Sequence, residues 1–178
     1  MKPYTLLRPL MTILIDTPRL QMRHFTPDDA DAVLAFSGPE VTRYTGDDGA
    51  IQNLDDARRV IREIWQAEYQ RHGYARYALV HKASQRVIGF CGLKYEPHLA
   101  GADLGYRMLP EYWGQGLGRE AAEAALRYGQ QVLGLDPIYA EVVEQNRASR
   151  RIIEGLGMVW LCQFEDAGET VHRYRTPA

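Results

Sequence analysis

Three glycines occur at every second position in YWGQGLGREA, the run from Tyr112 to Ala121, and an Ala- and Glu-rich stretch of helical character follows directly. Glycine carries no side chain, so a loop of this kind leaves its backbone N–H groups unshielded. The start of the helix adds a partial positive charge. The combination favours binding of a phosphate group. The alternative interpretation is a tight turn that binds nothing.

Two known phosphate-binding motifs can be compared with this loop. A nucleoside-triphosphate loop requires Gly-Lys followed by Ser or Thr, whereas Gly118 is followed by Arg119 and Glu120. The dinucleotide fingerprint G-x-G-x-x-G/A matches formally from Gly116. However, too little chain follows it for a doubly wound sheet. The sequence therefore disfavours both of these nucleotide sites.

A second short motif, NRAS, begins a predicted helix at about residue 147. Asn146 is a residue type that commonly caps a helix N-terminus. Ser149 shares an apolar stripe with Ile152, Ile153 and Leu156, which follow it at helical spacing. Periodicity alone favours a core hydroxyl at Ser149 over a proton donor.

Composition narrows the class of protein. The chain has 178 residues, of which 46% are hydrophobic, and a formal net charge of -2. This length predicts one domain, and the charge gives no basic field for nucleic acid. No stretch approaches the roughly 20 apolar residues that cross a bilayer. We expect a cytoplasmic protein with an N-terminal extension at 1–12 and one domain at 13–178.

The two cysteines, Cys91 and Cys162, lack the clustered spacing of a metal site or a disulfide framework. Neither has a His or an acidic partner nearby in the sequence, as a nucleophilic thiol would need. We therefore expect two buried thiols and no metal.

The elements that must position these residues form a mixed α/β pattern. Strands are expected at 13–24, 74–80, 86–95, 102–109, 139–143 and 158–164 and in the last residues, with helices after Thr26 and over 55–71, 119–133 and 147–154. Short links between the three central strands predict an antiparallel meander, and a strand-helix-strand crossover in the second half predicts a parallel pair. Gly129, on the apolar face of its helix, suggests close approach to the sheet.

YWGQGLGREAAEAAL, followed some thirty residues later by NRASRRIIEGLGM, closely resembles the GCN5-related N-acetyltransferase (GNAT) superfamily. Within it, TPRLQMR at 17–23, ADLGYRMLPEYWGQGLGREA at 102–121 and NRAS at 146–149 are most similar to the ribosomal-protein alanine N-acetyltransferase (RimJ/RimL-like) group. The resemblance covers nearly the whole chain from about residue 13. It implies a GNAT acyl-CoA N-acyltransferase fold with about seven mostly antiparallel strands, a central parallel pair splayed at the cofactor site and about four helices.

The resemblance also implies a cosubstrate, because in this superfamily an R/Q-x-x-G-x-G/A loop cradles the pyrophosphate of acetyl-CoA. Trp113 departs from Arg or Gln at the first position, whereas Gly116 and Gly118 match. A bulge in the strand 102–109, to which Gly105 is suited, would expose backbone groups to the pantetheine arm and the oxyanion. The implied cofactor-binding residues are Arg107, Met108, Leu109, Gly114, Gln115, Gly116, Leu117, Gly118, Arg119 and Asn146.

For catalysis, the resemblance gives Ser149 the role of general acid toward the leaving thiolate. Asp103, on the strand beside the expected cleft, is the candidate general base. Alternatives are Glu141, Glu165, Glu169 and His172, each of which is otherwise an ordinary surface charge, or a chain of water molecules. The richest polar patch in the predicted acceptor region contains Arg43, Tyr44, Asp47 and Asp48.

Three functions remain open at this point. The first is an N-acetyltransferase that moves the acetyl group from acetyl-CoA to a primary amine by direct attack, such as a ribosomal-protein or other protein N-terminus. The second acetylates a small amine, for example an antibiotic, a polyamine or an amino-acid-like compound. The third is a non-catalytic acyl-CoA sensor. A homodimer is compatible with all three.

Overall fold

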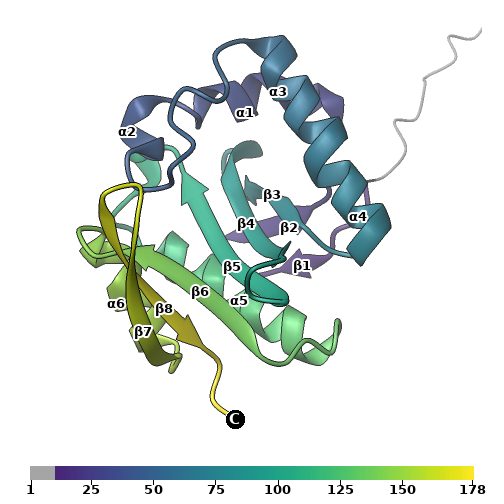
Figure 1. Ribbon diagram of the computed structural model, residues 1–178. Helices are drawn as coiled ribbons and strands as arrows, with labels where there is room; N and C mark the ends of the chain where they lie inside the picture. Colours follow the sequence, from purple (N-terminus) through teal and green to yellow (C-terminus); the bar gives the residue numbers. More distant parts are fainter. Residues whose placement is uncertain (1–10) are drawn as a thin grey trace, which may run out of the picture.

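The computed structural model describes residues 11–178 and has an eight-stranded sheet at its centre (Figure 1). The strands are β1 (Ile15–Asp16), β2 (Leu20–Arg23), β3 (Arg76–His81), β4 (Arg86–Glu96), β5 (Gly101–Met108), β6 (Ile138–Val143), β7 (Val159–Asp166) and β8 (Glu169–Arg175). Their order is β1-β2-β3-β4-β5-β6-β8-β7, and β5 and β6 are the parallel pair. The predicted mixed, mostly antiparallel sheet is confirmed. The prediction for the first ten residues lies outside the described part.

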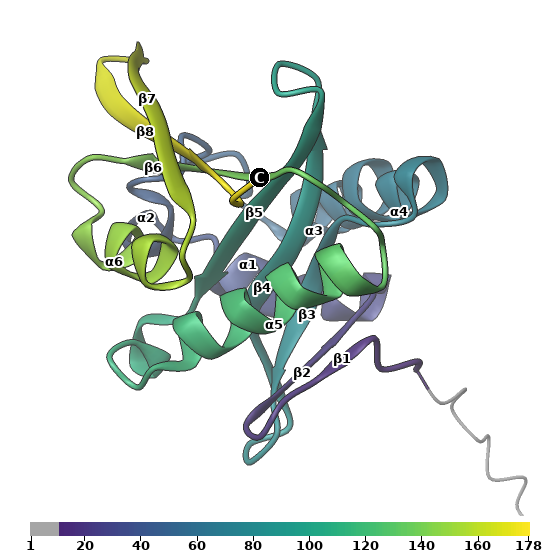
Figure 2. The same ribbon diagram turned by 90° about the horizontal axis from the view of Figure 1, so that it is seen from below.

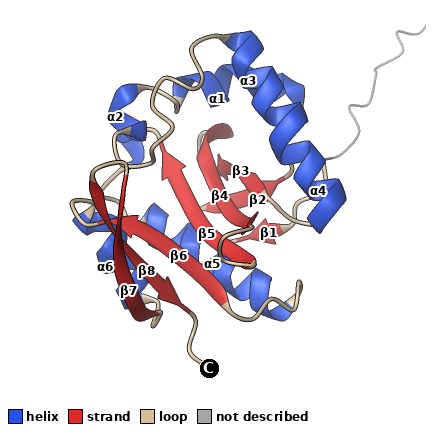
Figure 3. Ribbon diagram, viewed as in Figure 1, coloured by secondary structure: helices blue, strands red, loops and turns tan. Residues whose placement is uncertain are grey.

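Helices cover both faces of the sheet (Figure 3). They are α1 (Ala30–Ala35), α2 (Pro39–Thr42), α3 (Leu54–Val60), α4 (Ala67–His72), α5 (Leu117–Gln131) and α6 (Arg147–Gly155). A π-helical stretch at Ile61–Gln66 joins α3 to α4. Figure 2 shows α5 across one face of the sheet, with α1, α3 and α4 on the other. No helix within residues 11–178 has the length and apolarity to cross a membrane.

Local signals account for the helix ends. The amide oxygen of Asn53 accepts a hydrogen bond from the backbone N–H of Asp56, which caps α3. Gly73 ends α4 at a φ of 81°, in the left-handed region that glycine tolerates. The backbone N–H of Thr26 donates to the Asp29 carboxylate at the start of the first helical segment. The two predicted helices, after Thr26 and over 55–71, are confirmed.

The prediction of a single strand over 13–24 is wrong, because this segment folds as the two strands β1 and β2. β1 and β2 pair antiparallel, with Ile15 opposite Met22. The turn between them is closed by Thr17, whose hydroxyl accepts from the N–H of Leu20 at 3.0 Å. The short helix α2 was not predicted either. The hairpin brings the number of strands in the described residues to eight, against about seven expected.

The central parallel pair separates after its first residues. β5 and β6 pair at Ala102 with Ile138 and at Asp103 with Tyr139, and the pairing continues no further. The pairing of β5 with β4 runs from Gly101 to Met108 without a register shift. The predicted splay is therefore present, but the predicted bulge in β5 is not. Gly105 has another role, since a Cβ there would lie 2.5 Å from the guanidinium of Arg76.

Close packing of α5 on the sheet follows from a glycine. A Cβ on Gly129 would lie 2.3 Å from the Leu93 side chain and 2.8 Å from that of Ile138, so a larger residue here would displace these two buried side chains. This confirms the close approach predicted from the apolar face of the helix.

The two cysteines differ in their surroundings. Cys91 is fully buried in the core beneath α5, and burial raises the pKa of its thiol to about 12. Cys162 is only partly buried on β7, which corrects the expectation of two buried thiols. β7 lies at one edge of the sheet, and most of its residues are exposed. Among the described residues no cluster of ligands could hold a metal ion.

Candidate active site

The glycine loop forms the N-terminus of α5. Gly114 and Gly116 have φ values of 71° and 79°, a conformation that turns successive N–H groups toward one side of the loop. Within residues 11–178, the backbone N–H groups of 114–119 donate no hydrogen bond to the protein. A Cβ on Gly114 would meet no atom within 4 Å, so the space in front of the loop is open. The loop therefore fits a phosphate group in both shape and hydrogen-bonding capacity.

The β1–β2 hairpin holds this loop from outside. The Arg19 side chain donates to the Gln115 carbonyl oxygen at 2.8 Å and to the Glu120 carboxylate at 2.7 Å. The Thr17 hydroxyl donates to the same carboxylate at 2.7 Å. Burial alone would raise the pKa of Glu120, but hydrogen bonds from Thr17 and Arg19 outweigh it and lower that pKa. The TPRLQMR block thus positions the glycine loop, a role that its sequence did not indicate.

Arg19 provides a test of this clamp. We expect Arg19→Ala to weaken binding of acetyl-CoA, the predicted ligand, by about fivefold, because an exposed ion pair and one hydrogen bond each contribute roughly 1 kcal/mol or less. Calorimetric titration measures this change. Arg127→Ala is the matched control, since Arg127 forms an exposed ion pair with Glu123 elsewhere on α5. Equal affinity in wild type and Arg19→Ala would contradict the positioning role.

Two cavities meet at the gap between β5 and β6. The first, of about 460 Å³, is lined by the glycine loop, Ile152 and Ala148, and we call it the loop cavity. The second, of about 470 Å³, is lined by Arg76, Phe90, Asp103 and Glu141, and we call it the strand cavity. Tyr106, Arg107, Asn146 and Ser149 line both. The splayed strands therefore join two compartments into one cleft.

The backbone of β5 faces this gap at alternate residues. The N–H of Leu109 donates to the Ile88 carbonyl oxygen on β4 at 2.8 Å. Because antiparallel pairing alternates, the N–H groups of Arg107 and Leu109 point toward β4, and that of Met108 points toward the gap. The Met108 carbonyl oxygen accepts from the indole N–H of Trp113 at 2.8 Å. Of the backbone N–H groups of Arg107, Met108 and Leu109, only that of Met108 is therefore directed toward a ligand in the gap.

Helix α6 brings Asn146 and Ser149 to the junction of the cavities. The Asn146 amide oxygen accepts from the backbone N–H of Ser149 at 3.2 Å, which is the predicted N-cap. The Ser149 hydroxyl oxygen lies 2.9 Å from the hydroxyl oxygen of Tyr106. Burial raises the pKa of Tyr106, so this phenol stays protonated at neutral pH. Ser149 is therefore a hydroxyl in a polar contact rather than a packed core residue.

Asp103 lies on the floor of the strand cavity. One of its carboxylate oxygens accepts from the Arg76 guanidinium at 2.6 Å. The other is buried and has no hydrogen-bond partner within residues 11–178. Burial is the largest influence and raises the pKa of Asp103, while the charge of Arg76 opposes this shift. A carboxylate with a free oxygen and a raised pKa is suited to accept a proton.

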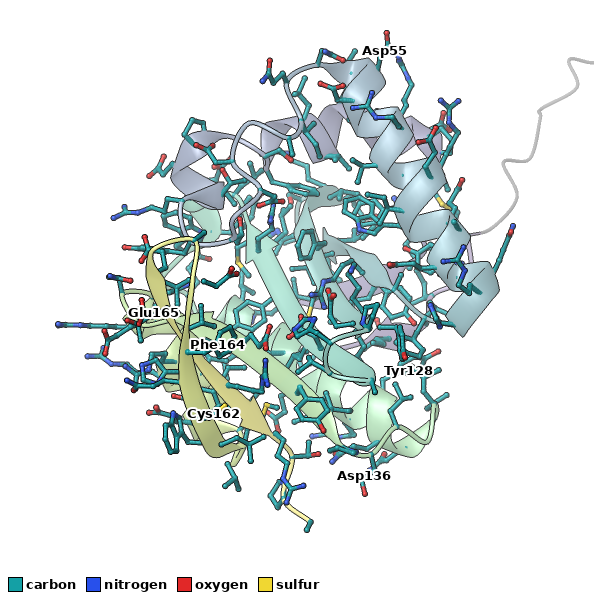
Figure 4. All side chains as sticks on the ribbon, viewed as in Figure 1. Asp55, Tyr128, Asp136, Cys162, Phe164 and Glu165 are labelled. Atoms are coloured by element: carbon teal, nitrogen blue, oxygen red, sulfur yellow. The ribbon has the colours of Figure 1, made fainter. Side chains whose placement is uncertain are left out.

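The four alternative candidates for the general base differ in whether they line the cleft. Glu141 and Glu169 line the strand cavity, but the Glu141 carboxylate accepts from Arg173 at 2.7 Å. Glu165 and His172 line neither cavity. Figure 4 labels Glu165 on β7, where its carboxylate accepts from the Thr170 hydroxyl. His172 is buried and its Nδ1 accepts from the indole of Trp160.

The predicted polar patch in the acceptor region lies over the same cleft. Arg43 stacks on the Tyr44 ring at 4.6 Å, and both residues line the two cavities. The Arg107 guanidinium, which is 7% exposed, forms an ion pair with Asp47 at 2.8 Å. Asp48 instead accepts from the Thr42 hydroxyl. The patch therefore remains exposed to solvent, but side-chain contacts hold it beside the cleft.

Most of the predicted site residues reach the cleft. The loop cavity is lined by Arg107, Met108, Gly114, Gly116, Leu117, Gly118, Arg119, Asn146 and Ser149. Leu109 and Gln115 line neither cavity. Arg119 is exposed, and its guanidinium donates to the Gly155 carbonyl oxygen at 3.3 Å. Sequence reasoning missed Arg19, Arg76 and Tyr106, whose partners are distant in the chain and leave no local pattern.

Comparison with known sequences gives a consistent result. Residues 19–159 match the family described as the acetyltransferase (GNAT) domain. The chain is 33% identical over 149 residues to the uncharacterized N-acetyltransferase YoaA of Bacillus subtilis (strain 168), with 81% of each chain covered. It is 32% identical over 143 residues to the uncharacterized N-acetyltransferase p20 of Bacillus licheniformis, with 79% of each covered.

Solved structures share the fold. One is RimL, described as a ribosomal L7/L12 alpha-N-protein acetyltransferase in complex with coenzyme A. It superposes with a TM-score of 0.79 at 16% identity, and the match covers 92% of this chain and 97% of that one. This chain therefore shares the fold of RimL.

Proposed function

The chain belongs to the GNAT acetyltransferase family, whose enzymes use acetyl-CoA, and from that premise we propose that it acetylates a primary amine by direct attack on acetyl-CoA. We further propose a peptide N-terminus as the acceptor, in line with the sequence blocks similar to the RimJ/RimL-like group. The observation that carries the proposal is the junction of the two cavities at Ser149, between the glycine loop and the compartment that contains Asp103.

The residues present fit the cosubstrate. The unpaired N–H groups of 114–119 and the N-terminus of α5 offer donors and partial positive charge to a pyrophosphate. The Met108 N–H, which faces the gap, is placed to donate to a developing oxyanion. When bound, acetyl-CoA supplies the thioester carbonyl that the amine attacks and the thiolate that leaves.

Two side chains of the junction move the protons in this proposal. Asp103 accepts a proton from the incoming ammonium, because its side chain lines the strand cavity and burial raises its pKa. Ser149 donates its hydroxyl proton to the leaving sulfur. Asp103 lines only the strand cavity, whereas Ser149 also lines the loop cavity, so the base lies on the acceptor side and the acid reaches the cosubstrate side.

A pH profile tests the base. If Asp103 must be ionised, kcat/KM falls as the pH falls through its pKa, and the raised pKa places this fall above the range of an ordinary carboxyl. We expect Asp103→Asn to remove this acid limb and to lower kcat/KM by about 100-fold, a typical contribution of a general base.

The control for that experiment is Asp55→Asn, because Asp55 lies at the exposed start of α3, far from the cleft (Figure 4). Thermal unfolding and coenzyme affinity of Asp103→Asn show whether the loss is structural, since the variant also weakens the contact with Arg76. An unchanged acid limb in Asp103→Asn would assign the base to Glu141, Glu169 or water.

Turnover measurements on different amines identify the class of acceptor. The strand cavity of about 470 Å³ has room for the first residues of a peptide or for a small amine. We would titrate the protein calorimetrically with acetyl-CoA and with NAD, and then measure free-thiol release over a panel of N-terminal peptides and small amines. We expect binding of acetyl-CoA alone and turnover on peptides. Turnover confined to small amines would overturn the peptide proposal, and no binding of acetyl-CoA would overturn the assignment of the loop.

A further inference from the structure

We propose that Tyr106 is a positioning residue that holds the Ser149 hydroxyl in the orientation needed for proton donation; this inference rests on the proposed function. Tyr106 lies on β5 and Ser149 on α6, 43 residues later, and their hydroxyl oxygens are 2.9 Å apart. Both line the loop cavity and the strand cavity. The pair therefore occupies the place where the two cavities meet.

The ring of Tyr106 is fixed by packing. Its side chain lies on the face of β5 that carries Leu104 and Met108, beneath α5. A Cβ on Gly118 would be 3.9 Å from the ring, so the ring passes directly under the glycine loop. Within residues 11–178, the Tyr106 hydroxyl forms hydrogen bonds only with the hydroxyl and the carbonyl oxygen of Ser149. A rigid aromatic ring thus directs its polar end at one residue.

Either hydroxyl can donate in this contact, and the proposed role needs Tyr106 to be the donor. Burial raises the pKa of Tyr106, which keeps the phenol protonated. The Asn146 amide oxygen is engaged with the backbone N–H of Ser149 rather than with its hydroxyl. Of the residues described, Tyr106 is therefore the side-chain partner of the Ser149 hydroxyl. When Tyr106 donates to this oxygen, the hydrogen of Ser149 is left free to point into the cleft.

This arrangement has a defined role in the transfer step. Ser149 gives its proton to the sulfur as the carbon–sulfur bond breaks, and the electron pair of that bond becomes the new S–H bond. The electron pair that remains on the Ser149 oxygen is stabilised by the O–H of Tyr106, which keeps its own proton. The acceptor enters as an ammonium and its nitrogen loses two protons, the first to Asp103 before the attack and the second to solvent as the amide forms. Solvent returns one proton to Ser149.

A double-mutant cycle tests the inference. We expect Tyr106→Phe to lower kcat by about tenfold, the equivalent of one hydrogen bond that strengthens in the transition state. The affinity for coenzyme A, measured by calorimetry without turnover, should stay within about twofold of wild type, because the hydroxyl does not hold the coenzyme. In a Ser149→Ala background, Tyr106→Phe should cause no further loss, since the residue acts through Ser149.

Tyr128→Phe is the matched control, because Tyr128 lies on α5 away from the cleft (Figure 4). An equal loss of kcat on replacing Tyr106 with and without Ser149 would overturn the inference, as would wild-type kcat in Tyr106→Phe. A weakened affinity for coenzyme A or a lower unfolding temperature beyond that of Tyr128→Phe would assign Tyr106 a structural role. Absence of thiol release by the wild type, in contrast, would overturn the proposed function itself.

A second readout does not depend on activity. A crystal structure of Tyr106→Phe should show the Ser149 hydroxyl turned to a different rotamer, because its side-chain partner is gone. The wild-type rotamer retained in this variant would mean that other contacts orient Ser149, and the positioning role would be lost.

Discussion

Gly116→Trp is expected to abolish binding of acetyl-CoA. Gly116 caps α5 at a φ of 79°, which disfavours any larger residue. A Cβ there would lie 3.5 Å from the Arg19 guanidinium, so an indole would displace the side chain that holds the loop and would distort the unpaired N–H groups. Loss of two hydrogen bonds to a charged phosphate, each about 1.5–3 kcal/mol, predicts at least a roughly 100-fold rise in Kd. Calorimetric titration of the folded variant measures this effect.

A control variant, Gly134→Trp, distinguishes an effect on the glycine loop from a general effect of backbone strain. Gly134 also has a positive φ, of 66°, with no atom within 4 Å of a Cβ, and it lies in the loop after α5. Gly134→Trp introduces the same residue and a similar strain away from the cleft. Circular dichroism and thermal unfolding of both variants show whether they fold alike. Wild-type affinity in a folded Gly116→Trp would remove the phosphate assignment from this loop.

Ser149→Ala is expected to lower kcat by about 100-fold, the lower end of a general acid's contribution, with little change in the affinity for acetyl-CoA. The reason is that the hydroxyl lies in the cleft, while the coenzyme is held mainly by backbone donors of the glycine loop. The Asn146 cap survives the change, because it binds the backbone N–H of residue 149. The helix should therefore form as in the wild type.

For Ser149→Ala, single-turnover thiol release measures the change in the chemical step, and calorimetry measures the change in the affinity for acetyl-CoA. Ser84→Ala serves as the control, since Ser84 lies on the exposed turn between β3 and β4. A general acid predicts that the loss in Ser149→Ala appears in kcat alone. Unchanged turnover would leave the leaving thiolate to be protonated by water and would remove the role of Ser149.

The sequence by itself determined the parts of this protein that depend on local interactions. The helix over 55–71, the meander of β3 to β5 and the crossover through α5 follow from apolar periodicity and from short links. Gly73 and Asn146 end and begin helices because their own backbone or side chain satisfies the nearby groups. The positive φ angles of the glycine loop also belong here, since they follow from its own glycines.

The tertiary structure alone decided how distant residues meet. Arg19 holds the glycine loop through Glu120, 101 residues away, and Tyr106 meets Ser149 across 43 residues. Such pairs carry no periodicity, because helix and strand patterns report contacts within a few residues. The gap between β5 and β6 likewise arises from pairing that stops after Asp103. The sequence thus determined which groups are available, and the packing of the sheet determined which of them face one another across the cleft.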